Sequence, residues 1–259
     1  MILLYNASTP MISRFLLLSP YFLQKAIWPV TKVLFSYFIK LQVHGLQNID
    51  SLGPGVVFVS NHSSELDPII VPASFPFFSK HFPMFYASRP RNFYIHSSWR
   101  KLFYGGLIFK IWGAHAVEKG QRDYALALKS HIDILSHKRS LLIFPEGRKT
   151  RTGLVDVSNS KGGAVYAAKQ TNLPIVPIVI QGLYKMTSRE FITRKRNVSV
   201  TFGQPIFAQD IISAHFSPEF EGDNEYKGAI RKVMQDISDK LSKSPYPAYP
   251  AHHPESLVR

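Results

Sequence analysis

The feature that most constrains the fold is a series of short apolar segments that end in polar turns and alternate with helical segments. The apolar stretch 56–59 is followed by a turn that carries His62 and Asp67. The stretch 141–144 is followed by a turn with one carboxylate and three cations within six positions. Short apolar runs that alternate with helical patterns are typical of α/β proteins. The sequence therefore predicts an α/β sheet whose strands deliver polar side chains to turns.

The hydrophobic periodicity places further elements along the chain. Helices are expected over residues 11–39 (with a break near Pro20), 162–170 and 226–241. Strands are expected over residues 55–60, 84–88, 140–144, 173–180 and 198–202. The prolines within 173–180 indicate an edge strand or a bulge, because proline cannot donate to a sheet ladder.

The turn after the first apolar stretch contains the residues of a general base. Asp67 follows His62 by five positions, at the point where a helix is expected to begin. This spacing allows the chain to fold back, so that the carboxylate contacts one imidazole nitrogen and leaves the other for a substrate. A histidine oriented in this way acts as a general base. The alternative is a polar turn in which Asp67 only caps the helix.

Two sequence blocks resemble one known family. The first is Asn61-His62 with Asp67 five positions after the histidine, and the second is Phe-Pro-Glu-Gly at residues 144–147. In this order, each at a strand end, they resemble the glycerolipid acyltransferase family, whose best-known members are 1-acyl-glycerol-3-phosphate acyltransferases. The resemblance covers roughly residues 41–206. It implies a mixed sheet wrapped by helices, with an N-terminal two-helix membrane-associated element.

The resemblance implies a reaction as well. A fatty acyl chain would move from acyl-CoA or acyl-carrier protein, as co-substrate, to the free hydroxyl of 1-acyl-sn-glycerol-3-phosphate, giving phosphatidic acid. His62 would remove the hydroxyl proton, and Asp67 would fix the imidazole tautomer and stabilise the imidazolium. The chain has no cysteine and no Gly-x-Ser-x-Gly elbow, so direct attack by the acceptor hydroxyl is the simplest scheme. A buried structural histidine is the alternative for His62.

The same resemblance implies a set of substrate-binding residues. They are Lys119, Glu146, Gly147, Arg148, Lys149, Arg151 and Pro177. The cations are expected to hold the acceptor phosphate. Glu146 is expected to order the turn or orient the acceptor glycerol, with a plain ion pair as the alternative. Gly147 is expected to allow a tight turn or close substrate approach, and Pro177 to shape a substrate channel.

The chain departs from the family among these cations. The family usually has arginine where Lys119 stands, and usually reads Glu-Gly-Thr-Arg-Ser where this chain has residues 146–150. Positive charge is kept, but the bidentate hydrogen bonding of arginine to phosphate is lost unless Arg148 or Arg151 supplies it. The departures leave open another lysophospholipid or lyso-amino-lipid as acceptor. They also leave open that some of these cations are solvated surface charges.

The charge of the chain indicates an anionic partner. Its formal net charge is +14, and 13% of its residues are aromatic. Because the cations are interleaved with large apolar side chains, the pattern suits a phospholipid membrane better than a nucleic acid. The sequence shows no nucleic-acid-binding signature and no His-Glu-x-x-His motif, so neither a nucleic-acid partner nor a metal site is expected. A non-catalytic lipid-binding protein is the alternative from another functional class.

The sequence suggests three parts. Residues 1–40 would form two short membrane-associated helices, residues 41–242 the α/β acyltransferase domain, and residues 243–259 a flexible Pro-rich tail. For the first part, a soluble helical cap or a true span by residues 1–24 with Arg14 at the interface remain alternatives. No cleaved signal peptide is expected. The expected location is the cytoplasmic face of a membrane, the inner or plasma membrane if the chain is bacterial.

Overall fold

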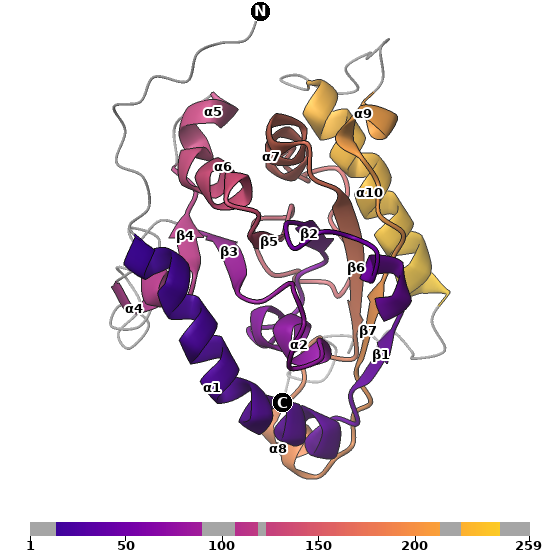
Figure 1. Ribbon diagram of the computed structural model, residues 1–259. Coiled ribbons are helices and arrows are strands. Elements are labelled where there is room, and N and C mark those ends of the chain that lie inside the picture. The colour runs from indigo at the N-terminus through magenta and orange to yellow at the C-terminus, as the bar shows by residue number, and fades with distance from the viewer. Residues whose placement is uncertain (1–13, 90–106, 119–122, 213–223, 244–259) are drawn as a thin grey trace, which may run out of the picture.

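The computed structural model describes residues 14–89, 107–118, 123–212 and 224–243. Within them, seven strands form one mixed sheet in the order β1-β7-β6-β2-β5-β3-β4 (Figure 1). The strands are β1 (Gln42–His44), β2 (Val57–Ser60), β3 (Met84–Ser88), β4 (Ala114–Ala116), β5 (Ser140–Ile143), β6 (Ile175–Gln181) and β7 (Ser199–Phe202). Neighbouring strands are parallel except β6 and β7, which are antiparallel. The predicted α/β fold with a mixed sheet is confirmed.

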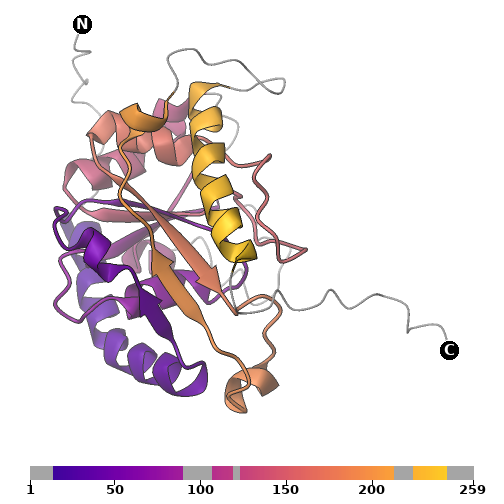
Figure 2. The same ribbon diagram turned by 90° about the vertical axis from the view of Figure 1, so that its right-hand side faces the viewer.

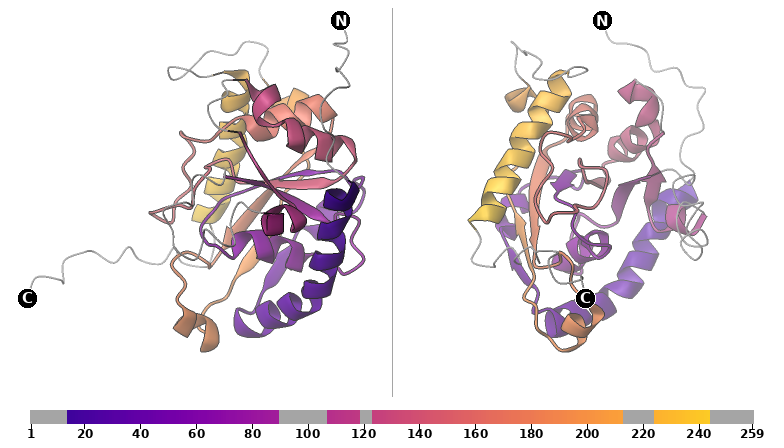
Figure 3. Two further views of the ribbon diagram at one scale, coloured as in Figure 1. Left: turned by 90° about the vertical axis from the view of Figure 1, so that its left-hand side faces the viewer. Right: turned by 180° about the vertical axis from the view of Figure 1, so that it is seen from behind.

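Helices cover both faces of this sheet. They are α1 (Arg14–Phe38), α2 (Asp67–Ser74), α4 (Leu107–Ile111), α5 (Tyr124–Ala127), α6 (Lys129–Ser136), α7 (Gly163–Thr171), α8 (Ser188–Ile192), α9 (Ala208–Ile211), α10 (Glu225–Ser242) and the 3-10 helix η1 (Leu46–Ile49). α1 and α10 lie on opposite sides of the sheet (Figures 2 and 3). Side chains of β2 alternate between two cores, with Val57 and Val59 facing α6, α7 and α10, and Phe58 facing α1 and α2.

The parallel strands bring their carboxyl ends to one edge of the sheet. β5 lies between β2 and β3, with Leu141 paired with Val57 on one side and with Phe85 on the other. Segments that follow parallel neighbours meet at the same edge, where α/β proteins bind their ligands. The turns after β2, β3 and β5 are therefore neighbours, although they are far apart in the sequence.

The N-terminal segment differs from its prediction. α1 continues through Pro20 and Pro29 without a break, so the expected pair of helices is wrong for the described residues. Each proline removes one helical hydrogen bond. Tertiary contacts compensate, since the Gln24 side chain donates to Met84 O (2.7 Å) and accepts from Met84 N (2.8 Å). The helix is thus fastened to β3 by side-chain hydrogen bonds.

α1 presents a long apolar surface to solvent. Its exposed large apolar side chains are Phe15, Leu18, Tyr21, Phe22, Leu23, Ile27, Val30, Val33, Leu34 and Tyr37. The opposite side of the helix packs against α2 and contributes Leu17 and Phe35 to the cores. Over the part of the chain that the structure describes, no helix is long and apolar enough to cross a membrane.

The strand with two prolines lies inside the sheet rather than at its edge. β6 is paired with β2 on one side and β7 on the other, so the edge-strand interpretation is wrong. Its ladder with β7 is irregular around Pro177: Ile175 pairs with Ile206 and Ile178 with Phe202, which leaves one extra residue on the β7 side. Pro177 keeps its carbonyl bonded to Gly203 N (2.8 Å). The bulge interpretation fits, because the missing amide hydrogen falls where the ladder is already interrupted.

The predicted three-part division stays a prediction. α1 covers most of the expected first part, and residues 1–13 lie outside the described residues. The expected tail lies outside them too, apart from residue 243.

Candidate active site

The imidazole of His62 is held by a carboxylate. His62 follows β2 directly, and Asp67 is the first residue of α2. Their Nδ1 and Oδ2 atoms are 2.8 Å apart. The ring of Phe144, which follows β5, stacks on the imidazole with centroids 4.2 Å apart and an interplanar angle of 20°. The imidazole is thereby fixed in orientation from two sides, while its Nε2 makes no hydrogen bond to a described residue.

The carboxylate of Asp67 is buried, and its hydrogen bonds all end on Oδ2, while its Oδ1 has no partner among the described residues. Asp67 is 0% exposed. Besides the imidazole, Oδ2 accepts hydrogen bonds from Ser63 N (2.6 Å) and Ser64 N (2.8 Å). Burial of a charged group is tolerable only with such partners, and the N-terminus of α2 adds a favourable dipole. A charged Asp67 requires the proton on Nδ1 of His62, which leaves the Nε2 lone pair free to accept a proton.

Glu146 ties the two predicted turns together. Its Oε1 accepts from His62 N (3.0 Å), and its Oε2 accepts from Asp156 N (3.2 Å). Burial raises the pKa of this carboxyl, although the same two backbone hydrogen bonds lower it. No ion pair joins Glu146 to a described cation, so the plain ion-pair interpretation does not fit. Among the expected roles, Glu146 orders the turn that carries the catalytic candidate.

Gly147 lies at a crowded, left-handed turn. Its φ is +62°, and a Cβ built there would lie 3.2 Å from Lys161 Nζ. Its carbonyl accepts a hydrogen bond from Arg89 Nε (2.6 Å). Both the backbone angle and the neighbouring lysine therefore favour glycine at this position.

Arg89 and Lys161 are residues of the site that the sequence interpretation missed. Arg89 directly follows β3, which is parallel to β5 and ends at the same edge of the sheet. A signal for it was present, since an arginine just after a predicted strand belongs to the same edge as the turns after β2 and β5. Lys161 reaches the site through the long loop before α7, and no local pattern in the sequence indicated that.

The predicted cations of the second turn are paired with carboxylates. Lys149 Nζ lies 2.8 Å from Glu65 Oε1, and Arg148 Nη2 lies 3.2 Å from Asp156 Oδ2. Thr150 N donates to His62 O (2.8 Å), so Lys149 is adjacent to the backbone of the histidine. The structure thus brings Lys149 and Arg148 to the carboxyl edge beside His62.

The other three predicted substrate-binding residues have no such ion pair in the described part of the site. Arg151 is exposed on the same turn. Pro177 is buried in β6, paired in register with Val59, so it lies beneath the site rather than in its lining turn. Lys119 lies outside the described residues.

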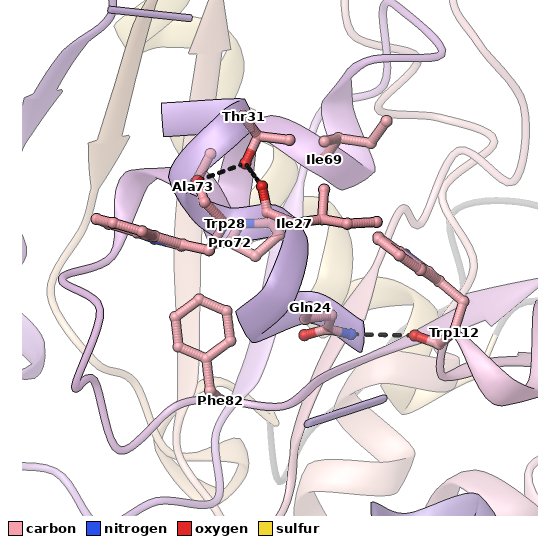
Figure 4. A pocket seen from close by; sticks show the side chains of 9 residues that line it. All are labelled: Gln24, Ile27, Trp28, Thr31, Ile69, Pro72, Ala73, Phe82 and Trp112. Carbon is pink, nitrogen blue, oxygen red and sulfur yellow. Dashed lines mark hydrogen bonds between the residues drawn. The ribbon is translucent and has the colours of Figure 1, made fainter. Parts of the chain in front are cut away.

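A small apolar recess lies between α1 and α2 (Figure 4). It is lined by Gln24, Ile27, Trp28, Thr31, Ile69, Pro72, Ala73, Phe82 and Trp112. Gln24 bonds to Trp112 O (3.0 Å) across one end of it.

The chemistry that this arrangement supports is proton removal beside a basic turn. A histidine with a free nitrogen and a carboxylate partner is a general base, and the adjacent cations favour an anionic ligand. The described residues contain no group of three or more metal-binding side chains. Fold and site together define an α/β protein with a histidine–carboxylate pair beside a basic turn.

The chain belongs to the acyltransferase family. A family model described as "Acyltransferase" matches residues 40–181, more than half of the chain. A chloroplastic 1-acyl-sn-glycerol-3-phosphate acyltransferase of Arabidopsis thaliana is 30% identical over 175 residues, which is 65% of this chain and 44% of the relative. The 1-acyl-sn-glycerol-3-phosphate acyltransferase of Saccharomyces cerevisiae is 24% identical over 143 residues, 54% of this chain and 45% of the relative. The resemblance inferred from the two blocks is confirmed.

A solved structure shares the fold. The crystal structure of the 1-acyl-sn-glycerophosphate acyltransferase of Thermotoga maritima matches with a TM-score of 0.58 at 18% sequence identity. The match covers 87% of this chain and 82% of that chain. Against the two curated relatives, by contrast, the matched region spans just under half of their length.

Proposed function

We propose that the chain transfers a fatty acyl group from a thioester, acyl-CoA or acyl-carrier protein, to the free hydroxyl of 1-acyl-sn-glycerol-3-phosphate. The observation that carries the proposal is the His62–Asp67 pair, 2.8 Å apart, beside the Lys149 turn. The relatives whose names state this activity support the choice of acceptor.

The proposed step uses residues that the structure brings together. Nε2 of His62 takes the proton of the acceptor hydroxyl as its oxygen attacks the thioester carbonyl. The C–O bond forms, and the tetrahedral intermediate expels the thiolate as the C–S bond breaks. The proton on Nε2 then passes to the thiolate, which leaves as a free thiol and returns His62 to its neutral form. Asp67 stabilises the imidazolium between the two proton transfers.

The cations have a separate proposed role. Lys149, Arg148 and Arg89 lie on or against the turn after β5 and would hold the phosphate of the acceptor. Glu146 would keep His62 in place, since it bonds the backbone of that residue. Lys119 and Arg151 keep their proposed roles as substrate-binding cations. Pro177, which pairs with Val59 of β2, keeps its proposed role in shaping a substrate channel.

Lipid contact is part of the same proposal. The exposed apolar side of α1 would lie on the surface of a phospholipid membrane, on the side where the acyl donor is found. Lys25, placed 4.2 Å from the Phe77 ring centroid, and Phe78, which is 90% exposed, extend this surface.

The experiment that tests the function is a thiol-release assay on the purified full chain. Acyl-CoA and acyl-carrier protein are offered with a panel of acceptors: lysophosphatidic acid, zwitterionic lysophospholipids, a lyso-amino-lipid and monoacylglycerol. The proposal predicts release that depends on an acceptor and is fastest with lysophosphatidic acid. A second candidate, another lysophospholipid acceptor, is favoured by lysine in place of the family's arginine at position 149, and a faster rate with a zwitterionic acceptor would support it. Lipid binding without thiol release would contradict both.

A further inference from the structure

The two turns of the site are joined by an ion pair that neither sequence block explains. Glu65 lies between His62 and Asp67 in the first turn, and its Oε1 is 2.8 Å from Lys149 Nζ in the second. The hydrogen bond from Thr150 N to His62 O holds the two backbones together at this point. The carboxylate of Glu65 is therefore paired with Lys149, a cation that lies beside the proposed general base.

We infer that Glu65 is an internal competitor for the anionic group of the acceptor. Its carboxylate neutralises Lys149 before the acceptor binds, and the acceptor phosphate displaces it on binding. This inference rests on the proposed function, because that function assigns Lys149 to the acceptor head group.

The exposure of the pair makes displacement feasible. The side chain of Lys149 is 39% exposed and that of Glu65 is 45% exposed. Solvent screens such a pair, and phosphate offers more negative charge and more acceptor oxygens than a carboxylate. The competition is thus weak, and its removal is expected to tighten acceptor binding about 1.5- to 5-fold, which corresponds to about 0.2–1 kcal/mol.

The competition affects binding rather than the chemical step. Nδ1 of His62 is bonded to Asp67, so proton transfer by Nε2 does not depend on Glu65. The competition also applies only to acceptors that use Lys149. Glu65 therefore reduces affinity for anionic acceptors and leaves a neutral acceptor unaffected, which makes it a determinant of specificity for the charge of the head group.

The test is the variant Glu65→Gln, which keeps the size of the side chain and removes its charge. The expected result is a KM for lysophosphatidic acid about 1.5- to 5-fold lower, with the change confined to KM and absent for monoacylglycerol. In a Lys149→Met background the same substitution should no longer lower KM, because the competition requires the Lys149 cation. Glu225→Gln is the matched control, since it breaks an equally exposed Lys169–Glu225 pair (3.0 Å) away from the site.

A binding measurement separates this inference from the proposed function. Titration of the full chain with sn-glycerol 3-phosphate, followed by NMR, should give a Kd for Glu65→Gln about 1.5- to 5-fold below that of the unmodified chain. Equal or weaker binding by Glu65→Gln would overturn the inference even if lysophosphatidic acid is acylated. Conversely, tighter binding without thiol release on any acceptor would leave the competitor in place and reject the proposed reaction.

Discussion

At the scale of single residues, Asp67 determines how His62 can act. In the proposed reaction its buried carboxylate keeps the proton on Nδ1, and two backbone donors from Ser63 and Ser64 fix the carboxylate in turn. An amide at position 67 would turn its oxygen toward these backbone donors and would still accept from Nδ1. It would, however, remove the charge that stabilises the imidazolium.

Asp67→Asn is therefore expected to lower kcat by at least about 10²-fold, the usual contribution of a positioned general base. Steady-state thiol release measures this, and circular dichroism checks that the variant is folded. Asp236→Asn is the control, because Asp236 pairs with Lys240 on α10 and has no contact with the site. A rate for Asp67→Asn within tenfold of the unmodified chain would reject the proposed role of the Asp67 charge.

Some site residues could be predicted from the sequence and others could not, for a physical reason. The contact between Asp67 and His62 is local, so a spacing of five positions was enough to predict it. Arg89 and Lys161 reach Gly147 from other segments, through strand order and a long loop. The ion pair between Glu65 and Lys149 depends on the side-by-side placement of two turns, which no local pattern encodes.

At the scale of elements, α1 shows how tertiary contacts override local signals. Pro20 predicted a break, yet the helix is continuous because side-chain bonds such as those of Gln24 to β3 fasten it to the sheet. The buried apolar strands were predicted well because their runs are distinctive, whereas the short β4 was not predicted. The position of β6 inside the sheet was not, because strand order depends on pairing between distant segments.

The exposed side of α1 gives a prediction about membranes. Phe22 and Val33 are each 67% exposed on this helix, and burial of such side chains in lipid is favourable by about 1.5–3 kcal/mol apiece at most. The double variant Phe22→Asp, Val33→Asp should therefore bind anionic phospholipid vesicles at least about tenfold more weakly in a sedimentation assay.

The control for vesicle binding is Leu126→Asp, because Leu126 is also exposed (51%) but lies on α5. It should bind vesicles like the unmodified chain. If both variants bind equally well, α1 is not the lipid-contacting surface.

At the scale of the whole molecule, the buried histidines His81, His115 and His131 make stability depend on pH, because burial lowers the pKa of each. Burial lowers the pKa of His131 to about 4 and that of His115, with a contribution from nearby Lys110, to about 4. His131 Nε2 lies 3.0 Å from His115 O, and each ring has one buried nitrogen without a partner among the described residues. Both imidazoles are thus neutral in the folded protein at pH 7.

Folding should weaken as the pH falls from about 6.5 toward 4. In this pH window the unfolded chain binds protons on these histidines, whereas the folded chain keeps them neutral. The free energy of unfolding therefore decreases by about 1.4 kcal/mol per histidine for each unit by which the pH falls. Urea unfolding at pH 7.5 and pH 5 measures the loss. His131→Gln should reduce the loss, whereas His44→Gln, at an exposed position of β1, should not. Equal pH dependence in all three proteins would contradict this account.

The fold class and the family were within reach of the sequence, because strand-and-turn blocks are local and the sheet follows from their alternation. The arrangement that makes the site, with three parallel strands ending at one edge, follows from strand order and was visible only in the structure. It places the turn with His62, the turn with Glu146 and the residue Arg89 against one another.

The central claim is that Nε2 of His62 removes the acceptor proton. The most direct test compares thiol release from acyl-CoA, with lysophosphatidic acid as acceptor, between the purified full chain and His62→Ala. The account predicts acceptor-dependent release by the unmodified chain and a kcat at least about 10²-fold lower for the folded variant. A His62→Ala variant that still transfers acyl groups at near the unmodified rate would contradict it.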